Sequence, residues 1–135
     1  MSDSLENRLL IKALEAMKEA YVPYSKFPVG AAVMTDTGEI FTGCNIESAS
    51  FGATVCAERT AIFKAVSEGH RHIRKIAVVS EHIDAYPCGI CRQVMAEFAD
   101  NLEIIIGKPG DYRVFALSEL LPHAFTARDL EEAAK

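Results

Sequence analysis

The spacing of apolar residues predicts a helix near the start of the chain, followed by a loop. Between residues 4 and 20, apolar side chains recur at three- and four-residue steps with charged side chains between them, which is typical of an amphipathic helix. Ser4 has a suitable side chain for the N-cap of this helix. Two prolines, Pro23 and Pro28, then predict a loop over residues 21–28.

The next apolar runs predict a β-hairpin and then alternating helices and strands. Small and branched residues fill 29–35 and 39–46, and the turn-forming segment Asp36-Thr37-Gly38 lies between them. The stretch at 73–80 is apolar almost throughout, as expected of a strand that is covered on both faces. Further strands are expected over 103–106 and 112–117, and a helix is expected over 57–68. A second helix is expected over 88–99, starting at Pro87, with Ile90 and Met95 facing inward. Short helices are expected over 118–121 and 126–133, with Ser118 and Thr126 at their starts.

This order of elements indicates an α/β protein with a mixed sheet of five strands and helices on both faces, which is a three-layer arrangement. A chain of 135 residues is long enough for one domain with a substantial core, and we expect a single domain over residues 1–135. The pattern leaves the order of the strands within the sheet open.

Charge and composition narrow the classes of partner. The net charge of -5 and the lack of a basic run argue against nucleic acid as a partner. No apolar run approaches the roughly 18–20 residues of a membrane span, and Met1–Asn7 lacks the basic region of a secretory signal. We therefore expect a cytoplasmic protein without a membrane partner. In that compartment the four cysteines are expected to be metal ligands, catalytic groups or core residues rather than disulfides.

Two short motifs carry the chemistry. Cys56-Ala57-Glu58-Arg59 and Pro87-Cys88-Gly89-Ile90-Cys91-Arg92-Gln93 each stand where a helix is expected to begin. Positive helix ends favour thiolates, and the three-residue step from Cys88 to Cys91 puts two sulfurs on one helix face. Together with Cys56 they offer three ligands. A zinc ion with three protein ligands keeps a fourth position for water, which indicates a catalytic rather than a structural site.

Glu58 and two arginines complete this hypothesis. A carboxylate beside metal-bound water can take up its proton and pass it to a reacting nitrogen, so Glu58 is the candidate acid and base, although spacing alone also allows it to be a fourth ligand. Three thiolates around Zn²⁺ leave a net charge of about -1, which opposes ionisation of the water. Arg59 and Arg92 are expected to offset that charge by hydrogen-bonding the sulfurs, and Arg59 is the better candidate.

Two other interpretations of the cysteines stay open at this point. Cys-x-x-Cys in an α/β protein also occurs as a thiol-redox motif, but that use leaves Cys56 without a role. A structural zinc site needs a fourth ligand, which Cys44, His72 or His82 supplies only by folding back. Cys44 lies in the expected second strand and is more typical of a small apolar strand residue.

Both motifs resemble those of the cytidine deaminase family. Zinc deaminases carry one ligand two residues before a glutamate and then Pro-Cys-x-x-Cys, which matches Cys56-Ala57-Glu58 and Pro87-Cys88-Gly89-Ile90-Cys91. Cysteine at the first ligand resembles the branch that acts on free nucleosides. The resemblance implies one Zn²⁺ per subunit and hydrolytic deamination of cytidine and deoxycytidine to uridine and deoxyuridine in pyrimidine salvage. It also implies that zinc-bound hydroxide attacks C4 while Glu58 shuttles protons to N3 and to the departing amine.

Other segments extend the resemblance over nearly the whole chain. Tyr24-Ser25-Lys26-Phe27-Pro28-Val29-Gly30 resembles the family's early loop, which implies that Phe27 packs against the pyrimidine ring. Gly43-Cys44-Asn45-Ile46-Glu47 resembles the ribose-binding segment, which implies that Asn45 and Glu47 bind the 3′-hydroxyl. By the same resemblance, Ala49 and Ala57 are expected to line the substrate site.

An assembly is implied as well. In homotetrameric members, aromatic side chains of neighbouring subunits complete each pocket, and Phe51 and Phe125 stand at the matching positions. Phe51 replaces a tyrosine of some relatives, and Ile90 is bulkier than the alanine often found inside the second motif. The chain lacks the second, degenerate domain of the longer dimeric members, so we expect a homotetramer with shared active sites. The alternatives are a related aminohydrolase of a cytosine-containing antibiotic, which would share both motifs, and a non-enzymatic structural-zinc or thiol-redox module.

Overall fold

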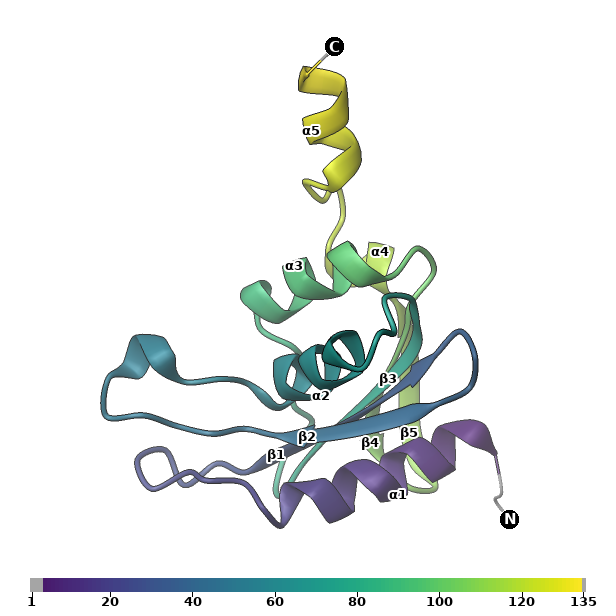
Figure 1. Cartoon of the computed structure of the whole chain (residues 1–135). Coiled ribbons are helices and arrows are strands. Elements are labelled where there is room, and N and C mark those ends of the chain that lie inside the picture. Colours follow the sequence, from purple (N-terminus) through teal and green to yellow (C-terminus); the bar gives the residue numbers. More distant parts are fainter. Residues whose placement is uncertain (1–3, 135) are drawn as a thin grey trace.

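The computed structural model describes residues 4–134 and contains a mixed five-stranded sheet between two layers of helices (Figure 1). This confirms the expected α/β fold class, while the expected domain limits, residues 1 and 135, lie outside the described residues. The elements in chain order are α1 (Leu5–Met17), β1 (Val29–Thr35), β2 (Ile40–Cys44), η1 (Phe51–Ala53), α2 (Ala57–Ser67), β3 (Ile73–Ser80), α3 (Gly89–Phe98), β4 (Glu103–Lys108), β5 (Asp111–Ala116), α4 (Leu117–Leu120) and α5 (Ala127–Ala133).

The strand order, which the sequence left open, is β2-β1-β3-β4-β5. β1 lies between β2 and β3 and is antiparallel to both, and Ala32 pairs with Thr42 on one side and with Ala77 on the other. β3 and β4 are parallel, so the chain must cross over between them, and α3 forms that crossover. β5 returns antiparallel to β4 at the edge.

Alternation along the inner strands divides the core between the two faces of the sheet. In β1, Ala31 and Val33 join the apolar cluster under α2 and α3, whereas Ala32 and Met34 join the cluster under α1. Figure 1 shows the same division, with α1 along one face of the sheet and α2, α3 and α4 on the other. The near-continuous apolar runs of the sequence follow from this burial on both faces.

Two glycines let helices approach the sheet closely. A Cβ built on Gly30 of β1 would stand 2.0 Å from the carbonyl oxygen of Ala13 in α1. On the opposite face, a Cβ on Gly43 of β2 would stand 2.5 Å from the backbone nitrogen of Ala61 and 2.7 Å from the carbonyl oxygen of Ala57. The first turns of α2 are therefore seated directly on β2.

Helix starts agree with the sequence at two positions. The backbone N–H of Asn7 donates to Oγ of Ser4 over 3.1 Å, which confirms Ser4 as the N-cap of α1. Thr126 is the N-cap of α5, and its backbone N–H donates to the carboxylate of Asp129 over 2.7 Å. The α1 helix itself ends at Met17, earlier than expected.

Three local expectations were wrong. Pro87 lies one residue before the N-cap of α3, which is Cys88, and Ser118 lies inside α4, whose N-cap is Ala116. Ile90, which was expected to face inward, is 62% exposed, because Cys91 and Met95, four residues apart, form the buried face of α3 and Ile90 does not share it. The short helix η1 lies between β2 and α2, where the sequence pattern predicted neither helix nor strand.

The ends of the fold differ in how they pack. In Figure 1, α1 lies along the sheet, whereas α5 extends away from the sheet and from the other helices.

Among residues 4–134, none of the helices combines the length and the apolar character that a membrane crossing requires.

Candidate metal centre and active site

Three cysteine sulfurs meet where two helices begin. Cys56 is the N-cap of α2, Cys88 is the N-cap of α3, and Cys91 lies in the first turn of α3. Their sulfur atoms all lie within 4.8 Å of one another, and the Sγ atoms of Cys56 and Cys88 are 3.8 Å apart. We call these residues the thiol trio. Since both helices direct their N-termini at the trio, backbone partial charges favour thiolates there.

This donor set fits a zinc ion. Thiolates are ligands that zinc prefers, and among the described residues the trio has no fourth Cys, His, Asp or Glu close enough to join it. Cys44, one of the alternative fourth ligands, is the last residue of β2 and lies outside the trio. The residues present therefore match a metal site with three protein ligands and an open position.

The thiols of the trio shift one another's pKa values. A hydrogen bond from Cys91 lowers the pKa of Cys56 to about 5 against the opposing effect of burial, and a hydrogen bond from Arg59 adds to the lowering. The pKa of Cys91 is raised, because that thiol donates to the Cys56 sulfur and because it is buried. Metal binding requires deprotonated thiols, so zinc held by these three cysteines would displace their protons.

Of the two arginines expected at the sulfurs, Arg59 is in place. Its Nη2 atom lies 3.5 Å from Sγ of Cys56 and 3.5 Å from the carbonyl oxygen of Thr54. The hydrogen bond with Cys56 raises the pKa of Arg59. The guanidinium therefore connects the trio to the segment that precedes α2.

For Arg92 the expectation was wrong. Its Nε atom donates to the carbonyl oxygen of Pro87 over 2.7 Å, and its Nη1 atom donates to that of Leu120 over 2.6 Å. The side chain thus ties the residue before Cys88 to the end of α4. Its effect on the metal centre is to hold the backbone that presents Cys88.

Glu58 lies in the first turn of α2, two residues after Cys56, and only 4% of its surface is exposed to solvent. Burial raises the pKa of Glu58 to about 7, and the charge of Cys56 adds to the rise, while a backbone hydrogen bond lowers it. A carboxyl with a pKa near neutrality both accepts and donates protons readily. The carboxylate of Glu58 is not among the atoms that could share a metal with the trio. This favours a role for Glu58 as the proton carrier rather than as a fourth metal ligand.

A hollow of about 410 Å³ opens beside this centre. It is lined by Tyr24, Ser25, Glu47, Phe51 and Thr54, which come from the loop after α1 and from the segment between β2 and α2. In Figure 1 these two loops project from the same side of the sheet. Thr54, which lines the hollow, contacts Arg59 through its carbonyl oxygen, and Arg59 in turn contacts Cys56 of the thiol trio.

Asn45 and Phe27 lie together at the base of these loops. The Asn45 amide donates to the carbonyl oxygen of Phe27 over 2.9 Å and accepts from the backbone N–H of Val29 over 2.9 Å. Phe27 is partly buried against the core that contains α2. Ala57, buried at the start of α2, and Ala49, exposed in the loop before η1, are the two alanines expected to line the substrate site.

Known proteins share this arrangement and sequence. A family profile described as the "cytidine and deoxycytidylate deaminase zinc-binding region" matches residues 3–107. The chain belongs to the cytidine and deoxycytidylate deaminase family. It is 50% identical over 132 residues to a cytidine deaminase of Halalkalibacterium halodurans, and the match covers 95% of this chain and 100% of the relative.

A solved structure and a more distant relative extend this family comparison. The chain resembles the crystal structure of cytidine deaminase from Burkholderia pseudomallei with a TM-score of 0.83 and 46% identity, covering 93% of this chain and 100% of the other. A blasticidin-S deaminase of Bacillus cereus is 35% identical over 111 residues, 76% of this chain and 79% of the relative. The family of zinc-dependent deaminases is thereby established, and the zinc site falls within the matched region.

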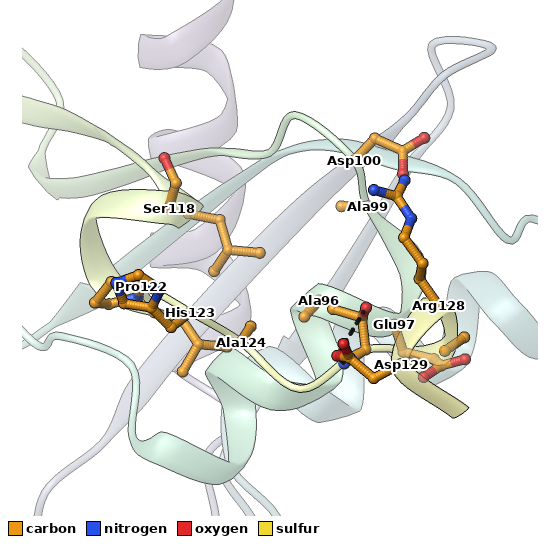
Figure 2. Close-up of a pocket in the computed structure, with 14 residues that line it drawn as sticks. Ala96, Glu97, Ala99, Asp100, Ser118, Pro122, His123, Ala124, Arg128 and Asp129 are labelled. Atoms are coloured by element: carbon orange, nitrogen blue, oxygen red, sulfur yellow. Dashed lines mark hydrogen bonds between the residues drawn. The ribbon is translucent and has the colours of Figure 1, made fainter. Parts of the chain in front are cut away.

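The two aromatic residues expected to complete the site of a neighbouring subunit are largely exposed. Phe51 in η1 is 73% exposed and Phe125, between α4 and α5, is 59% exposed. A second hollow has a volume of about 580 Å³. Figure 2 shows the residues that line it, which come from α3, α4, the first turn of α5 and the segments between them. Ala124 and Thr126 line it, but Phe125 does not, and no member of the thiol trio does. The second hollow is therefore separate from the metal centre.

Sequence reasoning missed several contacts around the site. Ser25 was quoted only as part of a loop, yet its hydroxyl contacts Glu47 and the backbone of Phe27. Gln93, two residues after Cys91, donates to the carbonyl oxygen of Phe125 over 2.6 Å. The local sequence carries no signal for the contacts of Ser25 with Glu47 and of Gln93 with Phe125, because each joins segments that only the fold brings together.

Proposed function

We propose that this protein catalyses the hydrolytic deamination of cytidine and deoxycytidine to uridine and deoxyuridine, with release of ammonia, as a step of pyrimidine salvage. The observation that carries this proposal is the thiol trio with a buried carboxyl, Glu58, two residues after Cys56. Membership of a deaminase family over almost the whole chain supports it.

Cys56, Cys88 and Cys91 would hold one zinc ion per subunit. When bound, the zinc supplies Lewis-acid activation of the water that replaces the amino group. The side chain of Arg59 offsets part of the negative charge of three thiolates through Cys56. The N-termini of α2 and α3 act in the same direction.

Glu58 carries the protons of the reaction. It accepts a proton from the attacking water and donates it to ring N3, which makes C4 more electrophilic as the C–O bond forms. It then delivers the remaining hydroxyl proton to the amino nitrogen, so that the C4–N bond breaks and neutral ammonia leaves. The raised pKa of Glu58, about 7, suits a group that must both take and give a proton.

The hollow beside the trio would hold the nucleoside. Phe27 packs against the pyrimidine ring, Asn45 and Glu47 bind the 3′-hydroxyl, and Ala49 and Ala57 line the site. Asn45 keeps a second amide hydrogen after its bond to Phe27, so it can hold the loop and still donate to a ligand.

The complete enzyme would be a single-domain subunit in a homotetramer with shared active sites. Phe51 and Phe125 are the side chains that would contribute to the site of a neighbouring subunit, and both are largely exposed. The net charge of -5 fits a small nucleoside rather than a nucleic acid, and we place the protein in the cytoplasm without a membrane partner.

An ultraviolet assay of cytidine loss, coupled to detection of ammonia, tests this function. The zinc-loaded protein is expected to convert cytidine to uridine, and a chelator that removes zinc is expected to stop the conversion. Blasticidin S offered under the same conditions is expected to be a much poorer substrate. Faster turnover of the antibiotic would favour the alternative aminohydrolase, and absence of ammonia with both compounds would contradict deaminase activity.

A further inference from the structure

The loop that carries Phe27 and the segment that carries Glu47 meet at one side chain, Ser25. Its hydroxyl donates to Oε2 of Glu47 and accepts from the backbone N–H of Phe27, with 3.1 Å between nitrogen and oxygen. The backbone N–H groups of Tyr24 and Ser25 donate to Oε1 of Glu47 over 3.0 and 3.1 Å. Both carboxylate oxygens are therefore held by residues 24 and 25.

The Ser25 hydroxyl also closes an unusual turn of the backbone. Lys26 has a φ of 60°, a left-handed conformation that side-chain-bearing residues rarely adopt. The bond from the Phe27 N–H to the Ser25 hydroxyl spans this residue, as serine side chains do in turns. On its other side, the Phe27 carbonyl accepts from Asn45. Ser25 and Asn45 thus fix both backbone polar groups of Phe27.

Glu47 has little freedom left once these bonds are made. A carboxylate offers about four lone-pair sites, and the two N–H groups and one hydroxyl of Tyr24 and Ser25 occupy three positions around it. The three hydrogen bonds therefore fix the direction in which the remaining lone pair of the Glu47 carboxylate points. Of the five residues that line the hollow, Glu47 alone carries a carboxylate, so this is where a sugar hydroxyl would donate.

We propose that Ser25 is a positioning residue of the nucleoside pocket. Its hydroxyl orients Glu47 toward the sugar 3′-hydroxyl and at the same time holds the turn that presents Phe27 to the base. The inference rests on the proposed function. It makes Ser25 a determinant of the discrimination between nucleosides with and without the 3′-hydroxyl, because only the former use the oriented lone pair.

Binding measured without turnover tests this role. In the zinc-loaded Glu58→Gln protein, calorimetry gives the Kd values of cytidine and of 3′-deoxycytidine. Adding Ser25→Ala is expected to reduce the preference for cytidine by roughly tenfold, the size expected for the loss of one charge-assisted hydrogen bond. Ser25→Thr keeps a hydroxyl and is expected to keep the preference within about twofold of the parent, whereas Ser25→Val, which has the shape of threonine without the hydroxyl, is expected to lose it.

Two further variants separate positioning from general damage. Ser67→Ala removes an exposed serine hydroxyl that bonds to the carbonyl of Lys64 at the far end of α2, and it is expected to leave both Kd values unchanged. In a Glu47→Ala background, Ser25→Ala is expected to reduce the preference no further. Thermal midpoint and zinc content are recorded for every variant, and the threonine–valine pair decides the question if the alanine variant does not fold.

An unchanged preference in Ser25→Ala and Ser25→Val, or equal weakening of both nucleosides, would overturn the inference. Its failure is distinct from failure of the proposed function, which would appear as absence of cytidine turnover in the unmodified protein. Absence of cytidine binding to the Glu58→Gln protein together with absence of cytidine turnover by the unmodified protein would overturn both.

Discussion

Nη2 of Arg59 lies 3.5 Å from Sγ of Cys56, so a fixed cation on α2 faces the thiol trio. Two helix N-termini supply further positive charge from the backbone. Three thiolates donate more negative charge than a divalent ion neutralises, and water on such an ion ionises less readily. The contact therefore relates a residue that binds no metal to the reactivity of the metal centre.

Arg59→Ala is expected to weaken zinc binding about 10- to 100-fold, as removal of a partner of a metal ligand does. Competition with a chromogenic chelator measures the affinity, and the cytidine assay measures turnover. Arg71→Ala, which removes an exposed arginine between α2 and β3, is the matched control. Unchanged zinc affinity and turnover in Arg59→Ala would contradict the charge-compensating role.

Glu58→Gln keeps the shape of the side chain and removes its ability to carry protons. We expect kcat to fall by at least about 10²–10⁴-fold, because the same group serves several proton transfers. Zinc content is expected to stay at one per subunit, since Glu58 lies outside the trio. The variant should also be no less heat-stable than the parent, because a buried ionisable group is replaced by a neutral one. Near-normal turnover with zinc bound would exclude Glu58 as the proton carrier.

Gly43→Ala tests the packing that places α2 against β2. The new methyl group would meet the backbone nitrogen of Ala61 at 2.5 Å and the carbonyl oxygen of Ala57 at 2.7 Å. Backbone atoms cannot move aside as a flexible side chain can, so we expect a loss of about 1–3 kcal/mol in the free energy of unfolding, measured in urea. Zinc affinity should fall with it, because Ala57 directly follows Cys56.

A glycine in open space provides the control for this experiment. A Cβ on Gly52, in η1, would meet no atom within 4 Å. Gly52→Ala is therefore expected to change the free energy of unfolding by less than about 0.5 kcal/mol. Equal stability of the Gly43 and Gly52 variants would show that α2 is not held at the distance described.

The sequence predicted the sheet and the helices well because apolar periodicity reports burial directly. The seven residues of β1 are all buried, and their small and branched side chains already indicated a strand. Helix starts that depend on tertiary contacts were harder to place. Ser118 is a good capping residue by type, but α4 begins one residue earlier, because Leu117 is drawn into the core and the N–H of Ala116 bonds to Glu119.

At the site, motif spacing and contact geometry carried different information. The spacing of Cys56, Cys88 and Cys91 indicated ligands, since helix ends and a three-residue step constrain where sulfurs can lie. Arg92 shows the limit of such reasoning. It follows a ligand just as Arg59 follows Glu58, yet it reaches the carbonyls of Pro87 and Leu120, and the position of α4 that makes this possible is not encoded near either motif.

Lys75 in β3 forms ion pairs with two carboxylates, one on α1 and one on the neighbouring strand β4. Its Nζ atom lies 3.0 Å from Oε2 of Glu6 and also pairs with Glu103 of β4. The hydrogen bond from Lys75 lowers the pKa of Glu6 below its ordinary value of 4.5. Burial by itself would lower the pKa of Lys75, but the bonds with Glu103 and Glu6 raise it above 10.5.

These shifts fix the sign of a pH effect on stability. A carboxyl whose pKa is lowered by folding stabilises the fold above its ordinary pKa, and the stabilisation disappears as the pH falls through the lowered value. A lysine whose pKa is raised stabilises the fold at all lower pH values until its carboxylate partners become protonated. Between about pH 5 and pH 10 both contributions are present, so the effect of removing Lys75 should be constant there.

Lys75→Met is expected to reduce the free energy of unfolding by about 1 kcal/mol at pH 7, because the carboxylates it releases are partly exposed and return to water. As the pH falls below 4.5, the difference from the unmodified protein should shrink, since protonated Glu6 no longer attracts Lys75. Urea unfolding of both proteins across pH 3–8 measures this difference, and effects of acid on the zinc site act on both and cancel. Lys12→Met, on the exposed face of α1, should show no such dependence. A difference that grows toward acid pH would mean that α1 is not held by this pair of carboxylates.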